Sequence, residues 1–188
     1  MYKCNHYLLF FLLSLTVFCQ NFNELDSLSV KYIGQKDGLL QLNVMDVEQD
    51  SLGYLWLSTQ DGLHRYNGSQ FKVYLSNPQD SSTIADDQLR DMYISKDALF
   101  AVSNSEGVLG LNLSKNKFFK LGDGSGTIGY KVLALEGGFL MFSMKNHFLL
   151  FDRVTQSIDK IELPKLDVDN HVMDLCCLLY TSPSPRDA

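Results

Sequence analysis

The sequence predicts an all-β fold: a partial β-propeller of about three four-stranded antiparallel blades plus the start of a fourth, after an N-terminal signal peptide. Residues 44–75 contain four short apolar or alternating runs separated by three turn signals, which is typical of a four-stranded meander. The pattern recurs along the chain, and Asp46 and Asp174 lie 128 positions apart at matching places. Three repeats over that span are about 43 residues each, within the range of propeller blades.

The first predicted blade covers residues 43–80. Its first two turns, at 50–53 and 60–62, each end in a glycine, which takes the positive φ of a tight reversal without strain. Asn67-Gly68 is the strongest two-residue hairpin signal in the chain. The four strands are expected at Val44–Gln49, Tyr54–Ser58, Leu63–Tyr66 and Gln70–Leu75.

The second strand of this blade is apolar on both faces. Tyr54 and Trp56 point to one side, and Leu55 and Leu57 point to the other. A surface sheet with one wet face does not need this pattern, whereas a propeller blade is covered on both faces by its neighbours.

Later repeats are predicted at 84–122 and 128–164, and a fourth blade begins at 167–176. They lack the Gly-Tyr-Leu-Trp core of the first, so Phe100 and either Met141 or Phe142 are expected in the layer of Trp56. The expected strands are Gln88–Ser95, Leu99–Asn104, Val108–Leu113, Lys117–Leu121, Tyr130–Glu136, Phe139–Met144, Phe148–Asp152 and Ser157–Leu163.

Composition excludes several classes of function. The 188 residues suit one ordinary domain, and a formal net charge of −6 argues against a nucleic-acid partner, which needs clustered Lys and Arg. Cysteines occur only at 4 and 19, near the N-terminus, and at 176 and 177. The body between them has none, so neither a disulfide scaffold nor a cysteine-based zinc site is available there.

Residues 1–20 have the features of a secretory signal peptide. Lys3 precedes an apolar run of about a dozen residues from Tyr7 to Phe18, too short for a spanning helix. Cleavage is expected near Cys19 or Gln20. Acylation of Cys19 is an alternative, although the preceding Phe18 is bulky for a lipoprotein signal. Either route exports the body, and a periplasm is the expected destination.

The last segment, 177–188, breaks the strand pattern just after the fourth blade begins. It reads CLLYTSPSPRDA and resembles a translated sequencing adapter, so it is left out of the fold prediction. The natural chain is expected to continue past Leu175.

One segment carries a family resemblance. From Asp50 to Phe71 the chain reads DSLGYLWLSTQDGLHRYNGSQF, which resembles the signature blade of the two-component regulator propeller. The signature residues are expected to be structural, and they are Asp50, Gly53, Trp56, Thr59, Asp61, Gly62, Leu63, Tyr66, Gly68 and Phe71.

The resemblance implies a periplasmic sensor in a hybrid histidine kinase or related regulator. Such receptors carry two propellers, an immunoglobulin-like three-tyrosine domain, a transmembrane helix, and a kinase or DNA-binding output. It implies an oligosaccharide ligand, a homodimeric receptor and no catalysis by this segment. In similar propellers a strand before the first blade, here Leu28–Ile33 within the lead-in at 21–42, completes the last blade and closes the ring.

The remaining candidate sites favour structural interpretations, and no metal site or cofactor is predicted. Trp56 has the strand spacing of a packed core residue more than of a ligand-stacking platform. The histidines lack ligand spacing, and the glycine-rich loop at 122–126 lacks a phosphate-loop ending. Ser114 and Lys117 lie in a polar hairpin with no base nearby. The other candidates are His64, His147, His171, Asp86, Asp87, Asp167 and Asp169.

Two alternatives remain open from sequence. Asp46, Asp91 and Asp174 recur at one strand position, where they either line the central channel or bond to a neighbouring loop. Acids at a channel mouth would suit a secreted propeller enzyme such as a lyase or glycosidase. A secreted scaffold that binds proteins through its rim is the other alternative.

Overall fold

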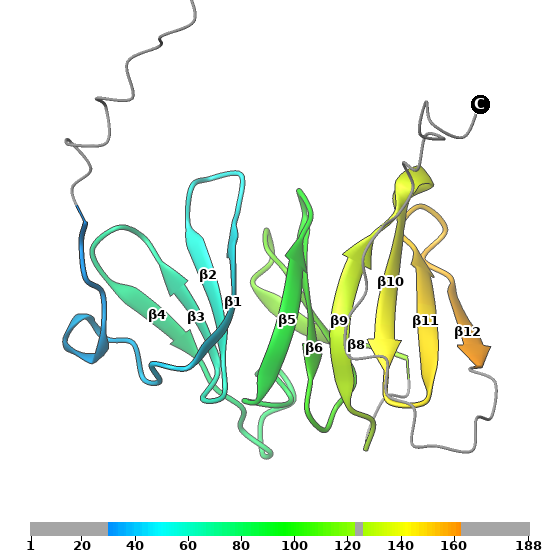
Figure 1. The fold of residues 1–188 in the computed structure, drawn as a ribbon, viewed down its shortest axis with the longest axis horizontal. Coiled ribbons are helices and arrows are strands. Elements are labelled where there is room, and N and C mark those ends of the chain that lie inside the picture. The colour runs from blue at the N-terminus through cyan, green and yellow to red at the C-terminus, as the bar shows by residue number, and fades with distance from the viewer. Residues whose placement is uncertain (1–29, 123–125, 163–188) are drawn as a thin grey trace, which may run out of the picture. The chain divides into compact units, whose positions relative to one another are not determined.

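The computed structural model describes residues 30–122 and 126–162, which are almost entirely β-structure (Figure 1). Its strands form three four-stranded antiparallel sheets, which confirms the predicted fold class. The predicted signal peptide, the predicted start of a fourth blade and the tail lie outside the described residues. The strands are β1 (Val44–Gln49), β2 (Leu55–Thr59), β3 (Leu63–Tyr66), β4 (Phe71–Tyr74), β5 (Leu89–Ile94), β6 (Ala98–Ser103), β7 (Val108–Asn112), β8 (Lys117–Leu121), β9 (Gly129–Ala134), β10 (Phe139–Met144), β11 (His147–Asp152) and β12 (Ile158–Glu162).

Each sheet is an up-and-down meander whose spatial order follows the chain: β1 to β4, β5 to β8, and β9 to β12. We call these sheets blades 1, 2 and 3. Their first strands are neighbours, with β5 between β1 and β9 (Figure 1). The helical content among the described residues is two 3-10 turns, η2 (Gln35–Asp37) and η3 (Glu136–Gly138), and no described helix has the length and apolar content needed to cross a bilayer.

All three first strands share a bulge near their start. The register shifts between Val44 and Asp46, between Leu89 and Asp91, and where β9 pairs Gly129 with Met144. A bulge inserts one extra residue and re-aims the side chains that follow it. Counting from the bulge aligns the blades, and Trp56, Phe100 and Met141 then occupy equivalent positions.

The core lies between the blades. One buried cluster joins blades 1 and 2 and includes Trp56, Leu89 and Leu111; a second joins blades 2 and 3 and includes Phe100 and Phe142. In blade 2 the strand β6 contributes alternately, since Ala101 packs toward blade 1 and Phe100 toward blade 3. Alternation to two apolar sides explains why β6 has no polar face.

One local prediction was wrong. The third turn is longer than two residues: Tyr66 and Phe71 are the last ladder pair, and the Asn67 N–H donates to the Gln70 carbonyl at 3.2 Å. Residues 30–33, the described part of the strand expected at Leu28–Ile33, are not in a strand, and Val30 is 90% exposed. The last blade that this strand is expected to complete is not among the described residues, so its pairing stays a prediction.

We expect residues 33–162 to self-associate when expressed alone. Apolar side chains on the outer blades remain open, since Met45 and Val47 of β1 and Ile161 of β12 are 42%, 51% and 45% exposed. Stacked repeats bury such faces only against a neighbour. Size-exclusion chromatography with light scattering measures the association, and a monodisperse monomer that unfolds cooperatively would contradict this expectation.

Candidate functional site

The turn between β1 and β2 is organised by Asp50. Its carboxylate accepts hydrogen bonds from the N–H groups of Leu52 (2.9 Å) and Tyr54 (3.0 Å), an Asx-type arrangement that fixes the reversal. Its other oxygen accepts from the Trp56 indole N–H at 2.8 Å. Gly53 completes the turn with a φ of +86°. One carboxylate therefore closes the turn and satisfies the polar atom of the largest core residue.

Trp56 packs between blades 1 and 2. It is 1% exposed and stacks on Tyr74 with ring centroids 5.7 Å apart. The Arg65 guanidinium lies 4.7 Å from the Tyr54 ring centre and 5.5 Å from that of Trp56. The indole N–H is bonded and the ring is covered, so this tryptophan offers no open face to a ligand. The sequence did not single out Arg65, because nothing local marks which rings it covers.

Thr59, Asp61 and Gly62 form the turn between β2 and β3. The Thr59 hydroxyl donates to the Gly62 carbonyl at 2.9 Å and accepts from the Asp61 N–H at 3.0 Å. Gly62 has a φ of +98°, and a Cβ there would lie 2.6 Å from the Tyr74 carbonyl oxygen. The Gly62 N–H donates to the Asp87 carbonyl at 2.8 Å, which ties this turn to the connection into blade 2.

The turn between β3 and β4 is held by side chains. The Asn67 side-chain oxygen accepts from the Ser69 and Gln70 N–H groups, and the Tyr66 hydroxyl donates to the Gly68 carbonyl at 2.6 Å. The Tyr66 and Phe71 rings are 4.7 Å apart between centroids. Leu63, at the start of β3, is fully buried.

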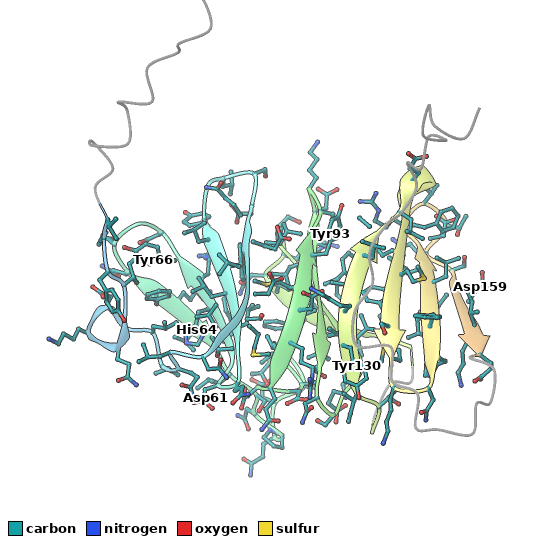
Figure 2. The ribbon with its side chains drawn as sticks, in the orientation of Figure 1. Asp61, His64, Tyr66, Tyr93, Tyr130 and Asp159 are labelled. Carbon is teal, nitrogen blue, oxygen red and sulfur yellow. The ribbon has the colours of Figure 1, made fainter. Side chains whose placement is uncertain are left out.

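His64 is fully buried in β3 (Figure 2). Its Nε2 accepts the Leu40 N–H at 3.3 Å, which holds the lead-in segment against blade 1. Burial lowers the pKa of His64, and the Gly62 backbone and the Asp61 carboxylate oppose that shift. A neutral histidine engaged by the lead-in is a structural residue of blade 1.

Two of the recurring aspartates bond to a strand of the neighbouring blade, whereas the sequence offered a place in the central channel or a bond to a neighbouring loop. Asp46 accepts the Met92 N–H at 3.0 Å, and Asp91 accepts the Val132 N–H at 2.8 Å. In each case the donor follows the residue at the same register in the next blade. We call these two contacts the inter-blade clasps. The third aspartate, Asp174, lies outside the described residues.

At the matching register of blade 3 the residue is Lys131. Its ammonium donates to Asp91 at 3.2 Å, so the second clasp is also an ion pair. Burial is the largest influence on the Asp91 carboxyl and raises its pKa; the negative charge of Asp46 adds to this, while the Val132 N–H and Lys131 oppose it. The pKa of Glu48 is also raised. Burial is the main cause, and the negative charges of Asp46 and Asp91 add to it.

The other acidic candidates are engaged with backbone and hydroxyl groups. Asp87 accepts from the Ser76 N–H at 2.6 Å, and Asp86 accepts from the Ser105 N–H at 2.8 Å. No cluster of three or more metal-binding side chains occurs among residues 30–122 and 126–162. His147 begins β11, while Asp167, Asp169 and His171 lie outside the described part of the chain.

The polar hairpin at 114–117 is also structural. The Ser114 hydroxyl donates to the Asn112 side-chain oxygen at 2.9 Å, and Lys117 begins β8. Between them, Asn116 takes a φ of +48° and accepts the Tyr74 hydroxyl of blade 1 at 3.0 Å. Part of the glycine-rich loop at 122–126 lies outside the described residues.

Hollows open on the described surface. One of about 430 Å³ lies beside the 76–85 connection, and one of about 150 Å³ lies between Met45 and Arg90. Another, of about 570 Å³, lies between blades 2 and 3 and includes Phe100 and Arg153 in its lining. We call it the blade 2–3 hollow. Sequence reasoning did not find it, because it depends on side chains that only the blade register brings together.

Gly62→Ala should destabilise the protein more than Gly68→Ala. Both glycines have a positive φ, +98° and +95°, so each alanine should cost about 1–2 kcal/mol of unfolding free energy. Only the Gly62 variant also meets backbone, and that clash should add roughly 1–3 kcal/mol. Urea unfolding of both variants measures the difference, and equal losses would contradict the role given to the Tyr74 carbonyl.

Asp91→Asn should change how stability varies with pH. A raised carboxyl pKa means that the folded state holds its proton more tightly than the unfolded state. The stabilising contribution is therefore present below the unfolded value, near 3.8, and is lost as pH rises through the higher folded value.

We therefore expect the difference in unfolding free energy, wild type minus Asp91→Asn, to increase as pH falls from neutral toward 3.8. Glu48 titrates in both proteins, so its contribution largely cancels in the difference. A difference that decreases toward acid would show that the Lys131 ion pair outweighs burial.

Comparisons with known proteins agree with this architecture. Histidine kinase P4 from Formosa agariphila is 41% identical over 78 residues, which is 42% of this chain and 5% of that kinase. The extracellular domain assigned to the hybrid two-component system BT3049 of B. thetaiotaomicron superposes with a TM-score of 0.64 at 20% identity, covering 70% of this chain and 20% of that one.

The extracellular domain assigned to the one-component system BT4673 of the same organism gives a TM-score of 0.57 at 11% identity, covering 69% of this chain and 18% of that one. No protein-family model matches the sequence. The chain thus spans a small part of each of these relatives. With its three four-stranded blades the chain shares the fold of these extracellular domains, and over 78 residues, 42% of its length, it is similar in sequence to a histidine kinase.

Proposed function

We propose that this chain is part of the extracytoplasmic sensor of a two-component receptor, a hybrid histidine kinase or a propeller-linked regulator, and that it senses a carbohydrate-type ligand. The observation that carries the proposal is the combination of blade architecture with 41% identity to a histidine kinase over 78 residues. The extracellular origin of the structural neighbours supports a periplasmic location, as does the predicted signal peptide.

Sensing, in this proposal, requires no chemistry from the described residues. The acids that would serve a lyase or glycosidase are held in structural contacts: Asp46 and Asp91 in the clasps, Asp86 and Asp87 in the blade 1–2 connection. The ligand binds on this scaffold, and the output is produced by receptor domains further along the protein. The partners are the remaining blades, those downstream domains and a second copy of the receptor.

The sequence of the gene in its genomic context tests this proposal. We expect the reading frame to continue through further blades into a transmembrane helix and then a histidine kinase or DNA-binding output, because the described blades carry no output of their own. A frame that stops soon after the fourth blade, with no spanning helix beyond it, would contradict the receptor assignment. A reporter gene under the receptor's control then measures the response to oligosaccharides, and a receptor that ignores every saccharide would overturn the ligand class.

A further inference from the structure

The blade 2–3 hollow opens beside four turns on one side of the blades. They are the β5–β6 and β7–β8 turns of blade 2 and the β9–β10 and β11–β12 turns of blade 3. Tyr93 lies toward this end of β5, and Tyr130 lies toward the opposite end of β9 (Figure 2). The volume of about 570 Å³ is in the range of small-molecule sites.

Comparison with the junction between blades 1 and 2 explains why space is left. At that junction Tyr54, Trp56 and Tyr74 occupy the face of blade 1 that turns toward blade 2. The register places Ala98, Phe100 and Leu121 at the equivalent positions of blade 2. Each replacement is smaller than its counterpart, so aromatic bulk is missing where the hollow lies.

A fourth replacement removes more volume. Arg65, which covers two rings in blade 1, corresponds to Gly110 in blade 2. The Phe119 ring lies over Gly110, and a Cβ there would come within 2.1 Å of it. The Phe119 ring therefore occupies the space that a larger side chain at position 110 would take, and the residue is 37% exposed. The result is an aromatic surface bordering open space.

The opposite wall carries a cation where the first junction has an apolar residue. Leu113 of blade 2 packs against the core shared with blade 1, and Arg153 holds the equivalent place in blade 3. Arg153 donates from Nε to the Gly138 carbonyl at 2.9 Å and from Nη1 to the Tyr93 hydroxyl at 3.4 Å. No described residue accepts from Nη2, so the guanidinium is held in place with one nitrogen left for a ligand.

The remaining lining matches the chemistry of a sugar. The rings of Phe100, Phe119 and Phe151 offer apolar surface, and the side chains of Asn112 and Gln156 offer amide groups. Two cations, Lys96 and Arg153, outnumber the one carboxylate, Asp97, so the lining is net positive. A guanidinium recognises a carboxylate with charge-assisted hydrogen bonds.

We propose that the blade 2–3 hollow is the binding site for an acidic sugar of one or two rings, with its carboxylate on Arg153 and its apolar ring face on Phe119. The inference rests on the proposed sensor function and names the site and the ligand class within it. It does not involve the clasps or the signature turn, which hold the blades together.

The test uses the complete protein encoded by the gene and matched pairs of probes. Glucuronic and galacturonic acids are compared with glucose and galactose, and uronic-acid disaccharides with their neutral counterparts, by isothermal titration calorimetry. The wild type should bind the acidic member of at least one pair about tenfold or more tightly, the change expected for a charged hydrogen bond. The preference should weaken as salt is added.

Three variants locate the site. Ala98→Tyr restores the bulk that blade 1 carries at this register and should abolish binding. Arg153→Gln should remove the preference for the acidic probe. Lys145→Gln removes the same charge from an exposed turn outside the lining and should bind as the wild type does. Thermal unfolding verifies that each variant is folded, and Arg153→Gln decides alone if Ala98→Tyr does not fold.

The outcomes separate this inference from the sensor function. A receptor that responds to saccharides equally in the wild type, Ala98→Tyr and Arg153→Gln overturns the blade 2–3 site and leaves the sensor function standing. Equal binding of acidic and neutral probes overturns the ligand class. A receptor that responds to no saccharide, and binds none of the probes, overturns both.

Discussion

The constraint on which this structure depends is that each blade is apolar on both faces. A strand such as β6 sends Ala101 into the core shared with blade 1 and Phe100 into the core shared with blade 3, so no face is left for water. Burial of that surface is the main favourable term, and it is realised only between blades. A blade is therefore a unit of sequence and of hydrogen bonding, but it is not a unit of stability.

Polar contacts then fix how neighbouring blades meet, which hydrophobic burial alone does not specify. The clasps of Asp46 and Asp91 each join a carboxylate to one N–H of the adjoining strand, and Asp87 ties the Gly62 turn to the next connection. Such contacts are directional, whereas apolar packing tolerates sliding. The bulge matters here because it aims both aspartates toward the next blade from equivalent positions.

The sequence predicted what is local or periodic. It predicted the fold class and the strands Val44–Gln49, Lys117–Leu121 and Phe139–Met144 with the bounds observed, because alternation and flanking turn residues are written along the chain. It misjudged the Asn67-Gly68 turn, where a side-chain oxygen replaces a backbone acceptor. The strand expected at Leu28–Ile33 stays a prediction, because the last blade that it would complete is not among the described residues.

What the sequence could not provide was register. The bulges have no local signature in the sequence. Without their positions, either Met141 or Phe142 could be the equivalent of Trp56. Counting from the observed bulge shows that the equivalent residue is Met141. The clasp from Asp91 to Val132 spans 41 positions, too far for any pattern to indicate. The blade 2–3 hollow is hidden for the same reason, since small residues at Ala98 and Gly110 mean missing volume only once their counterparts in blade 1 are known.

Lys131 has a consequence for how this chain can be rearranged. In blades 1 and 2 the aspartate after the bulge accepts a hydrogen bond from a backbone N–H of the following blade. In blade 3 this position is Lys131, whose ammonium has no lone pair and cannot accept a hydrogen bond. Blade 3 can thus receive a clasp but cannot extend one from this position. The repeats are therefore not interchangeable. A tandem array of blade 1 copies could form the aspartate contact at every junction, whereas a blade that follows blade 3 would receive no such contact from Lys131.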